Sequence, residues 1–236
     1  MCRFVAYLGP RVTLDQLLLA PPHSLLRQSW APRLQTHGTV NADGFGVGWY
    51  DRSVRPEPAR YRTARPMWAD RSFASMAGLV SSTALLAAVR SATPPAPVEE
   101  SGAPPFTAGP WLFAHNGAVD SFHDGAGVEL RRSMSAARAA GLEGVSDSEV
   151  LFALLLDLLD DGASMREALA DVVGRVRGRL NLVMTDGSSV AASACGESLF
   201  VIDDGRRVVV ASEPFDDTAD WQRVPDGSFL ELKGPV

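Results

Sequence analysis

Three Asp-Gly dipeptides in the C-terminal part of the chain constrain its fold more than any other feature. They stand at 186–187, 204–205 and 226–227, each between short apolar runs. Asp-Gly in that setting is a strong signal for a tight β-hairpin turn. Hairpins build antiparallel sheet, and the regular strand–helix alternation of a doubly wound parallel sheet is missing. The pattern therefore predicts an α+β fold.

Further strands are predicted from apolar or alternating runs. They cover residues 2–8, 45–50, 84–90 and 111–115. The first is expected to stop at Gly9-Pro10, and the last to break at Asn116-Gly117. Alternating glycines within residues 45–50 indicate that another part of the chain approaches that backbone closely.

Helices are expected mainly between the strands, where they would cover the sheet faces. Capping boxes, in which Ser or Thr stands three residues before Gln or Glu, mark three helix starts. The predicted helices cover residues 13–19, 70–80, 150–159 and 168–176. Residues 91–110 hold six of the 16 prolines and are predicted to form a long ordered loop or a lid. Without a dividing linker, residues 1–236 are expected to form one domain.

Charge and cysteine usage exclude several classes of protein. Lys and Arg total 22 and Asp and Glu 28, a net charge of -6 without the basic stripe of a nucleic-acid-binding protein. No apolar run approaches the roughly 18 residues of a membrane helix, and no secretory signal is visible. Cys2 and Cys195 are too far apart for a disulfide framework or a zinc site. The expected setting is a reducing cytoplasm, with no metal and no cofactor.

Cys2 is the candidate nucleophile. Removal of Met1 is expected because the next residue is small, and it would leave a thiol and a free α-amine on one residue. An α-amine has an unperturbed pKa of about 7.7–8.0 and can act as a general base. A nucleophile and its base would then share one residue. The alternative is that Cys2 is only a small buried residue at the start of a strand.

Three other positions carry candidate chemistry. Arg90 ends an apolar strand, where burial is costly unless the guanidinium faces an anion. Asn116 and Gly117 offer a side-chain amide and a main-chain N–H for an oxyanion hole, although a hairpin turn would also explain them. Helix capping explains the neighbours of Asp147 but not Asp147 itself, which is free to face a cationic ligand.

Together these residues resemble the class II glutamine amidotransferases, which are N-terminal nucleophile (Ntn) hydrolases. The resemblance covers essentially the whole chain and implies a four-layer αββα sandwich of two antiparallel sheets between helices. Its motifs are Cys2, Asn41-Ala42-Asp43-Gly44, Arg90-Ser91-Ala92-Thr93, His115-Asn116-Gly117, Ser146-Asp147-Ser148-Glu149 and Ala211-Ser212-Glu213-Pro214.

The resemblance also implies a role for each site residue. Cys2 would be the nucleophile and its α-amine the base, with the oxyanion hole at Asn116 and Gly117. Arg90 and Thr93 would bind the α-carboxylate of a γ-glutamyl group, and Asp147 its α-ammonium. The chain has Ala88 where many relatives have histidine, and Pro94 where some have histidine.

Residues 24–33, 41–50 and 67–70 resemble the branch of this family that acts in ergothioneine biosynthesis. That resemblance implies hydrolysis of γ-glutamyl-hercynylcysteine sulfoxide to glutamate and hercynylcysteine sulfoxide. The leaving group carries a trimethylammonium group, which favours aromatic faces. Trp30, Trp68 and Phe106 are candidates for that contact, and core packing is the alternative reading of these aromatics.

Two other functions stay open at this point. One is a glutaminase subunit that delivers ammonia to a separate synthase, and the other is a non-catalytic γ-glutamyl-binding protein. The expected partner is a small-molecule γ-glutamyl conjugate, with no nucleic acid and no membrane. A homo-oligomer is compatible with the sequence.

Overall fold

Two antiparallel sheets form the centre of the computed structural model, which describes residues 2–235. Sheet A has seven strands in the order β11-β9-β10-β1-β4-β2-β3, and sheet B has five in the order β12-β8-β7-β6-β5. The strands of sheet A are β1 Arg3–Thr13, β2 Phe45–Trp49, β3 Ala59–Thr63, β4 Ser81–Val89, β9 Phe200–Asp203, β10 Val208–Ala211 and β11 Gln222–Arg223. Those of sheet B are β5 Phe106–Ala108, β6 Trp111–Val119, β7 Gly178–Thr185, β8 Ser189–Ala194 and β12 Ser228–Lys233.

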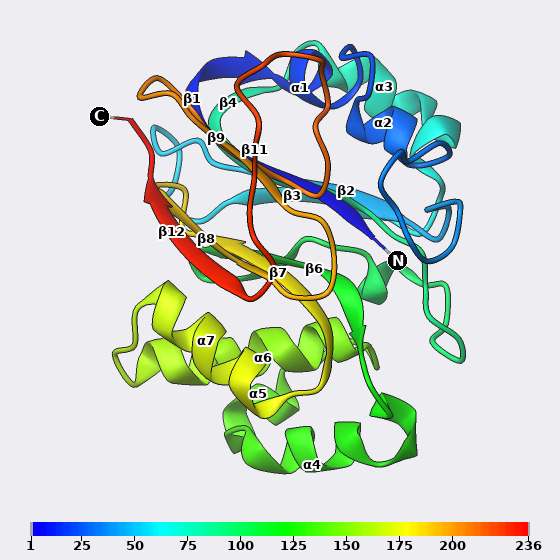
Figure 1. The fold of residues 1–236 in the computed structure, drawn as a ribbon, viewed down its shortest axis with the longest axis vertical. Coiled ribbons are helices and arrows are strands. Elements are labelled where there is room, and N and C mark those ends of the chain that lie inside the picture. The colour runs from blue at the N-terminus through cyan, green and yellow to red at the C-terminus, as the bar shows by residue number, and fades with distance from the viewer. Residues whose placement is uncertain (1, 236) are drawn as a thin grey trace.

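Helices lie outside both sheets. The longer ones are α1 Leu14–Leu18, α2 Leu25–Gln28, α3 Arg71–Ala77, α4 Ala126–Ser133, α5 Ala136–Ala140, α6 Asp147–Asp160 and α7 Met165–Arg175. Three short 3-10 turns are η1 Met67–Ala69, η2 Glu100–Gly102 and η3 Phe122–Asp124. Figure 1 shows α1 to α3 beyond sheet A and α4 to α7 beyond sheet B. The expected four-layer αββα sandwich is confirmed.

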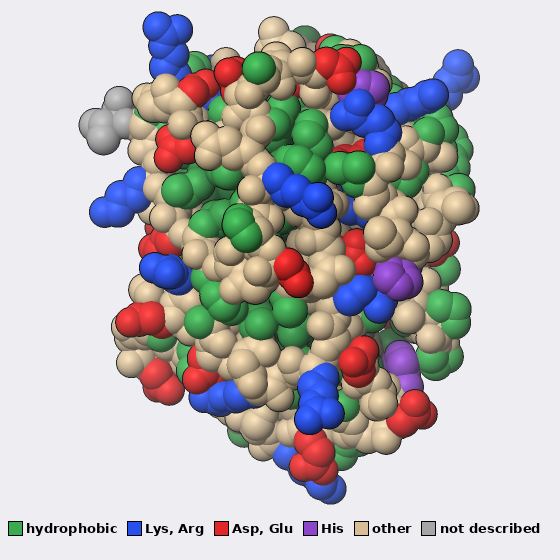
Figure 2. Space-filling view, viewed as in Figure 1, with side chains coloured by type: hydrophobic (Ala, Val, Ile, Leu, Met, Phe, Trp, Pro, Cys, Tyr) green, Lys and Arg blue, Asp and Glu red, His purple; other side chains and the backbone are tan. Residues whose placement is uncertain are grey.

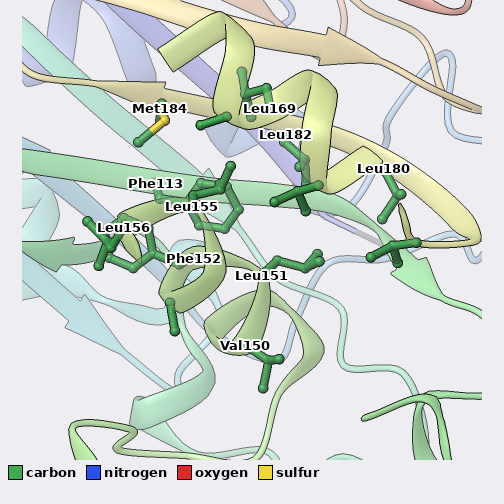
Figure 3. Close-up of a cluster of buried hydrophobic side chains, with 14 of the residues drawn as sticks. Phe113, Val150, Leu151, Phe152, Leu155, Leu156, Leu169, Leu180, Leu182 and Met184 are labelled. Carbon is green, nitrogen blue, oxygen red and sulfur yellow. The ribbon is translucent and has the colours of Figure 1, made fainter. Parts of the chain in front are cut away.

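Alternating side chains on β1 supply two of the three hydrophobic layers. Phe4, Ala6 and Leu8 pack between the two sheets, while Val5 and Tyr7 pack under the helices that cover sheet A. The third layer lies between sheet B and α6 and α7, where Figure 3 shows residues such as Phe113 and Leu151 meeting from strand and helix. Sheet A and sheet B are therefore buried on both faces over most of their area.

The predicted helix starts are confirmed, with one change in detail. Thr13 and Ser164 each form a full capping box. Ser146 accepts from the N–H of Glu149, but the Glu149 carboxylate accepts from the N–H groups of residues 143 and 144 instead of returning to the cap. Glu149 therefore anchors the loop before α6. The helix predicted over 70–80 ends earlier, at Ala77.

Two strands run through dipeptides that were expected to end them. β1 passes Gly9-Pro10 because the ladder to β4 is interrupted between Leu8 and Val12, so Pro10 sits at a bulge that needs no N–H. β6 passes Asn116-Gly117 and pairs with β7 as far as Val119. A Cβ on Gly117 would lie 1.8 Å from the carbonyl oxygen of Arg179, so glycine is needed for strand contact there. The hairpin-turn reading of Asn116-Gly117 is wrong.

One of the three Asp-Gly turns does not form a hairpin. The turns at 186–187 and 204–205 join β7 to β8 and β9 to β10 as expected. The turn at 226–227 instead carries the chain from β11 in sheet A to β12 in sheet B. Residues 91–110 are also less irregular than predicted, because they contain η2 and β5.

Two further features concern the surface charge and the length of the helices. In the face drawn in Figure 2, acidic and basic side chains are interspersed, without a continuous basic patch. No helix in the described part of the chain is long and apolar enough to cross a membrane.

Candidate active site

A cavity of about 340 Å³ lies where β1 begins and where β4 and β6 approach their C-terminal ends. Its lining includes five of the predicted site residues: Cys2, Arg90, Thr93, Gly117 and Asp147. These residues are far apart in the sequence, and three strand ends and one helix start bring them together. The structure thus places the candidate nucleophile beside the candidate binding groups.

Cys2 immediately precedes β1 and is half-buried. Phe4 and Ala6 face the space between the sheets, so strand alternation assigns Cys2 to the same side. The expected removal of Met1 concerns a residue outside the described range and stays a prediction. Cys195 follows β8 and is also a free thiol, packed against the core beside sheet B.

Arg3 fixes the start of β1 from the opposite face of sheet A. Its side chain is fully buried, its Nε donates to Oε1 of Gln35 at 3.3 Å, and both terminal nitrogens lack a partner within residues 2–235. Burial lowers the pKa of this guanidinium from its usual value, and the nearby carboxylates of Glu213 and Glu197 oppose that shift. Because Arg3 is adjacent to Cys2 in the chain, these contacts hold the candidate nucleophile in place.

Asn116 lies on the inter-sheet side of β6, as do Leu112 and Ala114. Its side chain is fully buried, and neither Nδ2 nor Oδ1 has a hydrogen-bond partner in the described structure. A buried amide without partners is costly in a protein that uses it only for packing. Asn116 is not itself part of the cavity lining, whereas the adjacent Gly117 is.

Arg90 is buried, 5% exposed, and its guanidinium meets only main-chain carbonyls. It donates to the carbonyl of Asp43 at 3.3 Å and to that of Pro97 at 3.1 and 3.2 Å. No carboxylate among residues 2–235 forms an ion pair with it. The guanidinium is therefore a buried cation without a counter-ion, at the wall of a cavity. Thr93 is exposed on the same rim.

Gly102 in η2 was not singled out from the sequence, although it determines where the Arg90 guanidinium can lie. A Cβ at this position would be 2.6 Å from Nη2 and 2.8 Å from Cζ of Arg90. Only a position without a side chain leaves room for that guanidinium.

We therefore expect Gly102→Ala to displace Arg90 and to raise KM for a γ-glutamyl substrate about 10-fold, the size of one weakened charge-assisted hydrogen bond. Steady-state kinetics would measure this change. Gly174→Ala is the matched control, because a Cβ there meets no atom within 4 Å. Equal KM values for the two variants would contradict the proposed role of Gly102.

Asp147 is the first residue of α6, and its carboxylate joins that helix to the end of β6. Oδ2 accepts from the N–H of Val119 at 2.9 Å, and Oδ1 accepts from the N–H of Ser148 at 2.7 Å. These bonds orient the carboxylate at the cavity wall, where it can also attract a cation.

His115 is a site residue to which sequence reasoning assigned no role. Its Nε2–H donates to the carbonyl of Arg179 at 2.9 Å, and that carbonyl fixes the tautomer so that Nδ1 accepts from Oγ of Ser148 at 3.1 Å. His115 thus links β6 to α6 directly beside Asn116 and Gly117. A histidine inside an otherwise apolar strand is the signal that could have identified it.

Trp30 and Trp68 do not line this cavity. They are 37% and 44% exposed and pack edge to face with ring centroids 5.9 Å apart. The core-packing alternative is therefore wrong for these two residues. Phe106 is buried and does line the cavity. No group of His, Cys, Asp or Glu within residues 2–235 is arranged to hold a metal ion.

Sequence similarity to known proteins identifies the family of the chain. Residues 24–204 match the sequence profile of the class II glutamine amidotransferases, which is well over half of the chain. The chain belongs to this family.

Three relatives show how far the similarity extends. A γ-glutamyl-hercynylcysteine sulfoxide hydrolase of Mycobacterium tuberculosis is 42% identical over 237 residues, covering 98% of this chain and 93% of the relative. The enzyme of the same name from Mycolicibacterium smegmatis is 41% identical, covering 99% and 96%. A solved structure from Silicibacter pomeroyi, described as a glutamine aminotransferase class-II domain protein, superposes with a TM-score of 0.69 at 26% identity, covering 98% and 95%.

Proposed function

We propose that this amidotransferase-family enzyme hydrolyses γ-glutamyl-hercynylcysteine sulfoxide to glutamate and hercynylcysteine sulfoxide. Two relatives that match nearly its whole length carry the name of that activity. The observation that supports it best is the cavity that holds Cys2 and the Arg90 cation, which has no ion-pair partner among residues 2–235. The Cys2 thiol suits attack on the side-chain amide of a γ-glutamyl group, and the Arg90 guanidinium suits binding of its α-carboxylate.

Binding of the γ-glutamyl half uses opposite charges at separate walls of the cavity. The α-carboxylate accepts from the Arg90 guanidinium and the Thr93 hydroxyl, and the α-ammonium donates to the Asp147 carboxylate. A planar guanidinium suits a carboxylate because it offers two parallel N–H donors. The three contacts leave the side-chain amide directed toward Cys2.

The reaction then proceeds in two steps. The Cys2 sulfur attacks the amide carbonyl carbon while the thiol proton passes to the α-amine, and the developing oxyanion is bound by the Asn116 side chain and the Gly117 N–H. The α-amine returns the proton to the leaving nitrogen as the C–N bond breaks, which gives a thioester. Water then attacks the thioester carbon while one of its protons passes to the α-amine, and the C–S bond breaks to release glutamate and, with that proton, the Cys2 thiol.

Arg90→Lys should raise KM at least about 10-fold with a smaller change in kcat. Lysine keeps the positive charge but loses the planar fork that binds a carboxylate through two hydrogen bonds. Initial-rate measurements over a range of conjugate concentrations would show this change. A variant with unchanged KM would contradict carboxylate binding by Arg90.

The deciding test of the function compares two substrates on the isolated chain. Glutamine has the same γ-glutamyl half but releases only ammonia, so it forgoes every contact with the leaving group. Loss of remote contacts usually lowers kcat as well as affinity. We expect kcat/KM for glutamine to be lower by at least about 10²-fold, or about 2.7 kcal/mol. A preference for glutamine, or activity only with a second subunit, would favour the ammonia-delivering alternative.

The remaining assignments are part of the same proposal. The setting is a reducing cytoplasm, consistent with the two free cysteines. Trp30 and Trp68 stay candidates for the trimethylammonium group, since an exposed aromatic pair offers ring faces to a cation. One domain over residues 1–236 suffices for hydrolysis without a cofactor.

A further inference from the structure

His115 is a buried titratable residue that the proposed reaction leaves without a role. It is 2% exposed, stands on β6 directly before Asn116 and Gly117, and contributes to the wall of the active-site cavity. It lies on the face of β6 that is turned toward α6, because its Nδ1 is 3.1 Å from Oγ of Ser148 in that helix. The ring is therefore placed between the proposed oxyanion hole and the start of the helix that carries Asp147.

The imidazole of His115 is held in one orientation. Its Nε2 donates to the carbonyl oxygen of Arg179 at 2.9 Å, and a carbonyl oxygen can only accept. A Cβ on Gly117 would lie 2.7 Å from the same Nε2, so the ring fills the space beside the glycine where a side chain would begin. In a neutral imidazole the other ring nitrogen then has no proton. Nδ1 is therefore an acceptor directed at Ser148.

The Ser148 hydroxyl has two acceptors within reach and a single proton to donate. Nδ1 of His115 lies 3.1 Å from its Oγ, and Oδ1 of Asp147 lies 3.2 Å from it. Because a hydroxyl carries one donor hydrogen, it cannot form both bonds at the same time. The acceptor strength of His115 therefore decides whether the hydroxyl also binds Asp147.

The direction of this hydroxyl matters because part of the Asp147 carboxylate is already occupied. Oδ2 accepts from the N–H of Val119, and Oδ1 accepts from the N–H of Ser148. A carboxylate offers about four lone-pair sites, so about two remain open at the cavity wall. A bond from the Ser148 hydroxyl would fill the second site of Oδ1. The α-ammonium of a substrate would then lose one of its two acceptors on Asp147.

We propose that His115 is a positioning residue for substrate binding: its Nδ1 accepts the hydrogen bond of the Ser148 hydroxyl and thereby keeps the Asp147 carboxylate open for the α-ammonium. The role rests on the proposed function only through the γ-glutamyl half, which the conjugate and glutamine share. His115 acts through Ser148 on Asp147 and not on the reacting atoms. Its bond to the carbonyl of Arg179 contributes by fixing the tautomer.

The alternative is that His115 only fastens β6 to α6. Both of its ring nitrogens form hydrogen bonds, as those of a structural histidine in a protein core would. The two roles differ in the effect of Ser148 once the acceptor at Nδ1 is removed. If His115 only fastens the two elements, removing the serine hydroxyl as well restores nothing. If His115 directs that hydroxyl, removing it restores binding of the α-ammonium.

The first experiment measures KM and kcat for the conjugate and for glutamine in His115→Gln and in the double variant with Ser148→Ala. His115→Gln keeps an N–H group for the carbonyl of Arg179 but places no acceptor at Nδ1, so the serine hydroxyl turns to Asp147. We expect KM to rise about 3- to 10-fold, the effect of one hydrogen bond, with kcat changed less than about twofold. Adding Ser148→Ala should return KM to near the wild-type value.

His23→Gln is the control for loss of a histidine, because the His23 ring pairs with the exposed Asp217 and does not line the cavity. It should have wild-type kinetics. A wild-type KM in His115→Gln would overturn the proposal. A double variant whose KM stays as high as that of His115→Gln would overturn it as well and would favour the fastening role.

The second experiment depends neither on turnover nor on a substitution of His115. Long-range ¹H–¹⁵N correlation spectra of ¹⁵N-labelled wild-type protein and Ser148→Ala report which ring nitrogen carries the proton. We expect the His115 proton on Nε2, and an Nδ1 signal that shifts when the serine hydroxyl is removed. A proton on Nδ1, or an Nδ1 signal unchanged in Ser148→Ala, would overturn the proposal. The expected spectra without hydrolysis of either substrate would overturn the proposed function alone.

Discussion

Cys2→Ala should abolish hydrolysis of the conjugate while the unfolding temperature stays within a few degrees of that of the wild type. The side chain is half-buried at the very start of β1 and makes no hydrogen bond within residues 2–235, so its loss costs little stability. The reaction, in contrast, loses its only attacking atom. Product formation followed by mass spectrometry and thermal unfolding followed by circular dichroism would measure the two effects.

Cys195→Ala is the matched control, because it removes the other thiol of the chain. Cys195 follows β8, and its N–H donates to Oδ1 of Asn181, a bond that alanine retains. This variant should keep most of its activity. An inactive Cys195→Ala together with an active Cys2→Ala would reverse the assignment of the nucleophile.

Asn116→Ala should lower kcat by about 10²- to 10³-fold with little change in KM, as removal of an oxyanion-hole donor does. It should also leave stability unchanged or slightly increased. The Asn116 amide has no partner in the described structure, so truncation orphans no other group and removes a desolvated one. Single-turnover kinetics and denaturant unfolding would separate the two effects.

Asn181→Ala is the comparison variant for Asn116→Ala, with the opposite expected effect on stability. Asn181 lies on β7, which pairs with β6. The Asn181 side chain donates to the carbonyls of residues 197 and 198 and accepts from the N–H groups of residues 195 and 197. Its truncation leaves those groups unpaired and should cost about 1–3 kcal/mol of stability. If Asn116→Ala destabilised the protein as much as Asn181→Ala and kept kcat, Asn116 would be a structural residue.

The sequence predicted the architecture well because local signals and topology agree here. Two Asp-Gly turns form the expected hairpins, and the cap residues Thr13, Ser146 and Ser164 begin the expected helices. The prediction of a hairpin at 226–227 was wrong because an Asp-Gly turn can also connect a strand of one sheet to a strand of the sheet stacked on it. Only the packing of the two sheets distinguishes these cases.

Sequence analysis identified some residues of the candidate site and missed others. Residues recognised as motif members, such as Arg90 and Asp147, do meet around one cavity. The sequence could not show that Gly102 limits the space around Arg90, because the two residues approach only after β5 joins sheet B. Trp30 and Trp68 were chosen for their chemistry alone, and no sequence signal indicated that they lie outside the cavity lining.

The layer between the two sheets is rich in alanine, and its thickness affects the geometry of the proposed active site. This layer includes Ala6, Ala84, Ala88, Ala114, Ala192 and Ala194. The proposed nucleophile, Cys2, extends from one sheet and the proposed oxyanion hole, Asn116 and Gly117, from the other, so the thickness of this layer determines their separation. Protein interiors are densely packed and yield little to compression. The two methyl groups that Ala88→Val adds to this layer would therefore increase the separation of Cys2 and Asn116, and reaction rate in this fold becomes a function of interior volume.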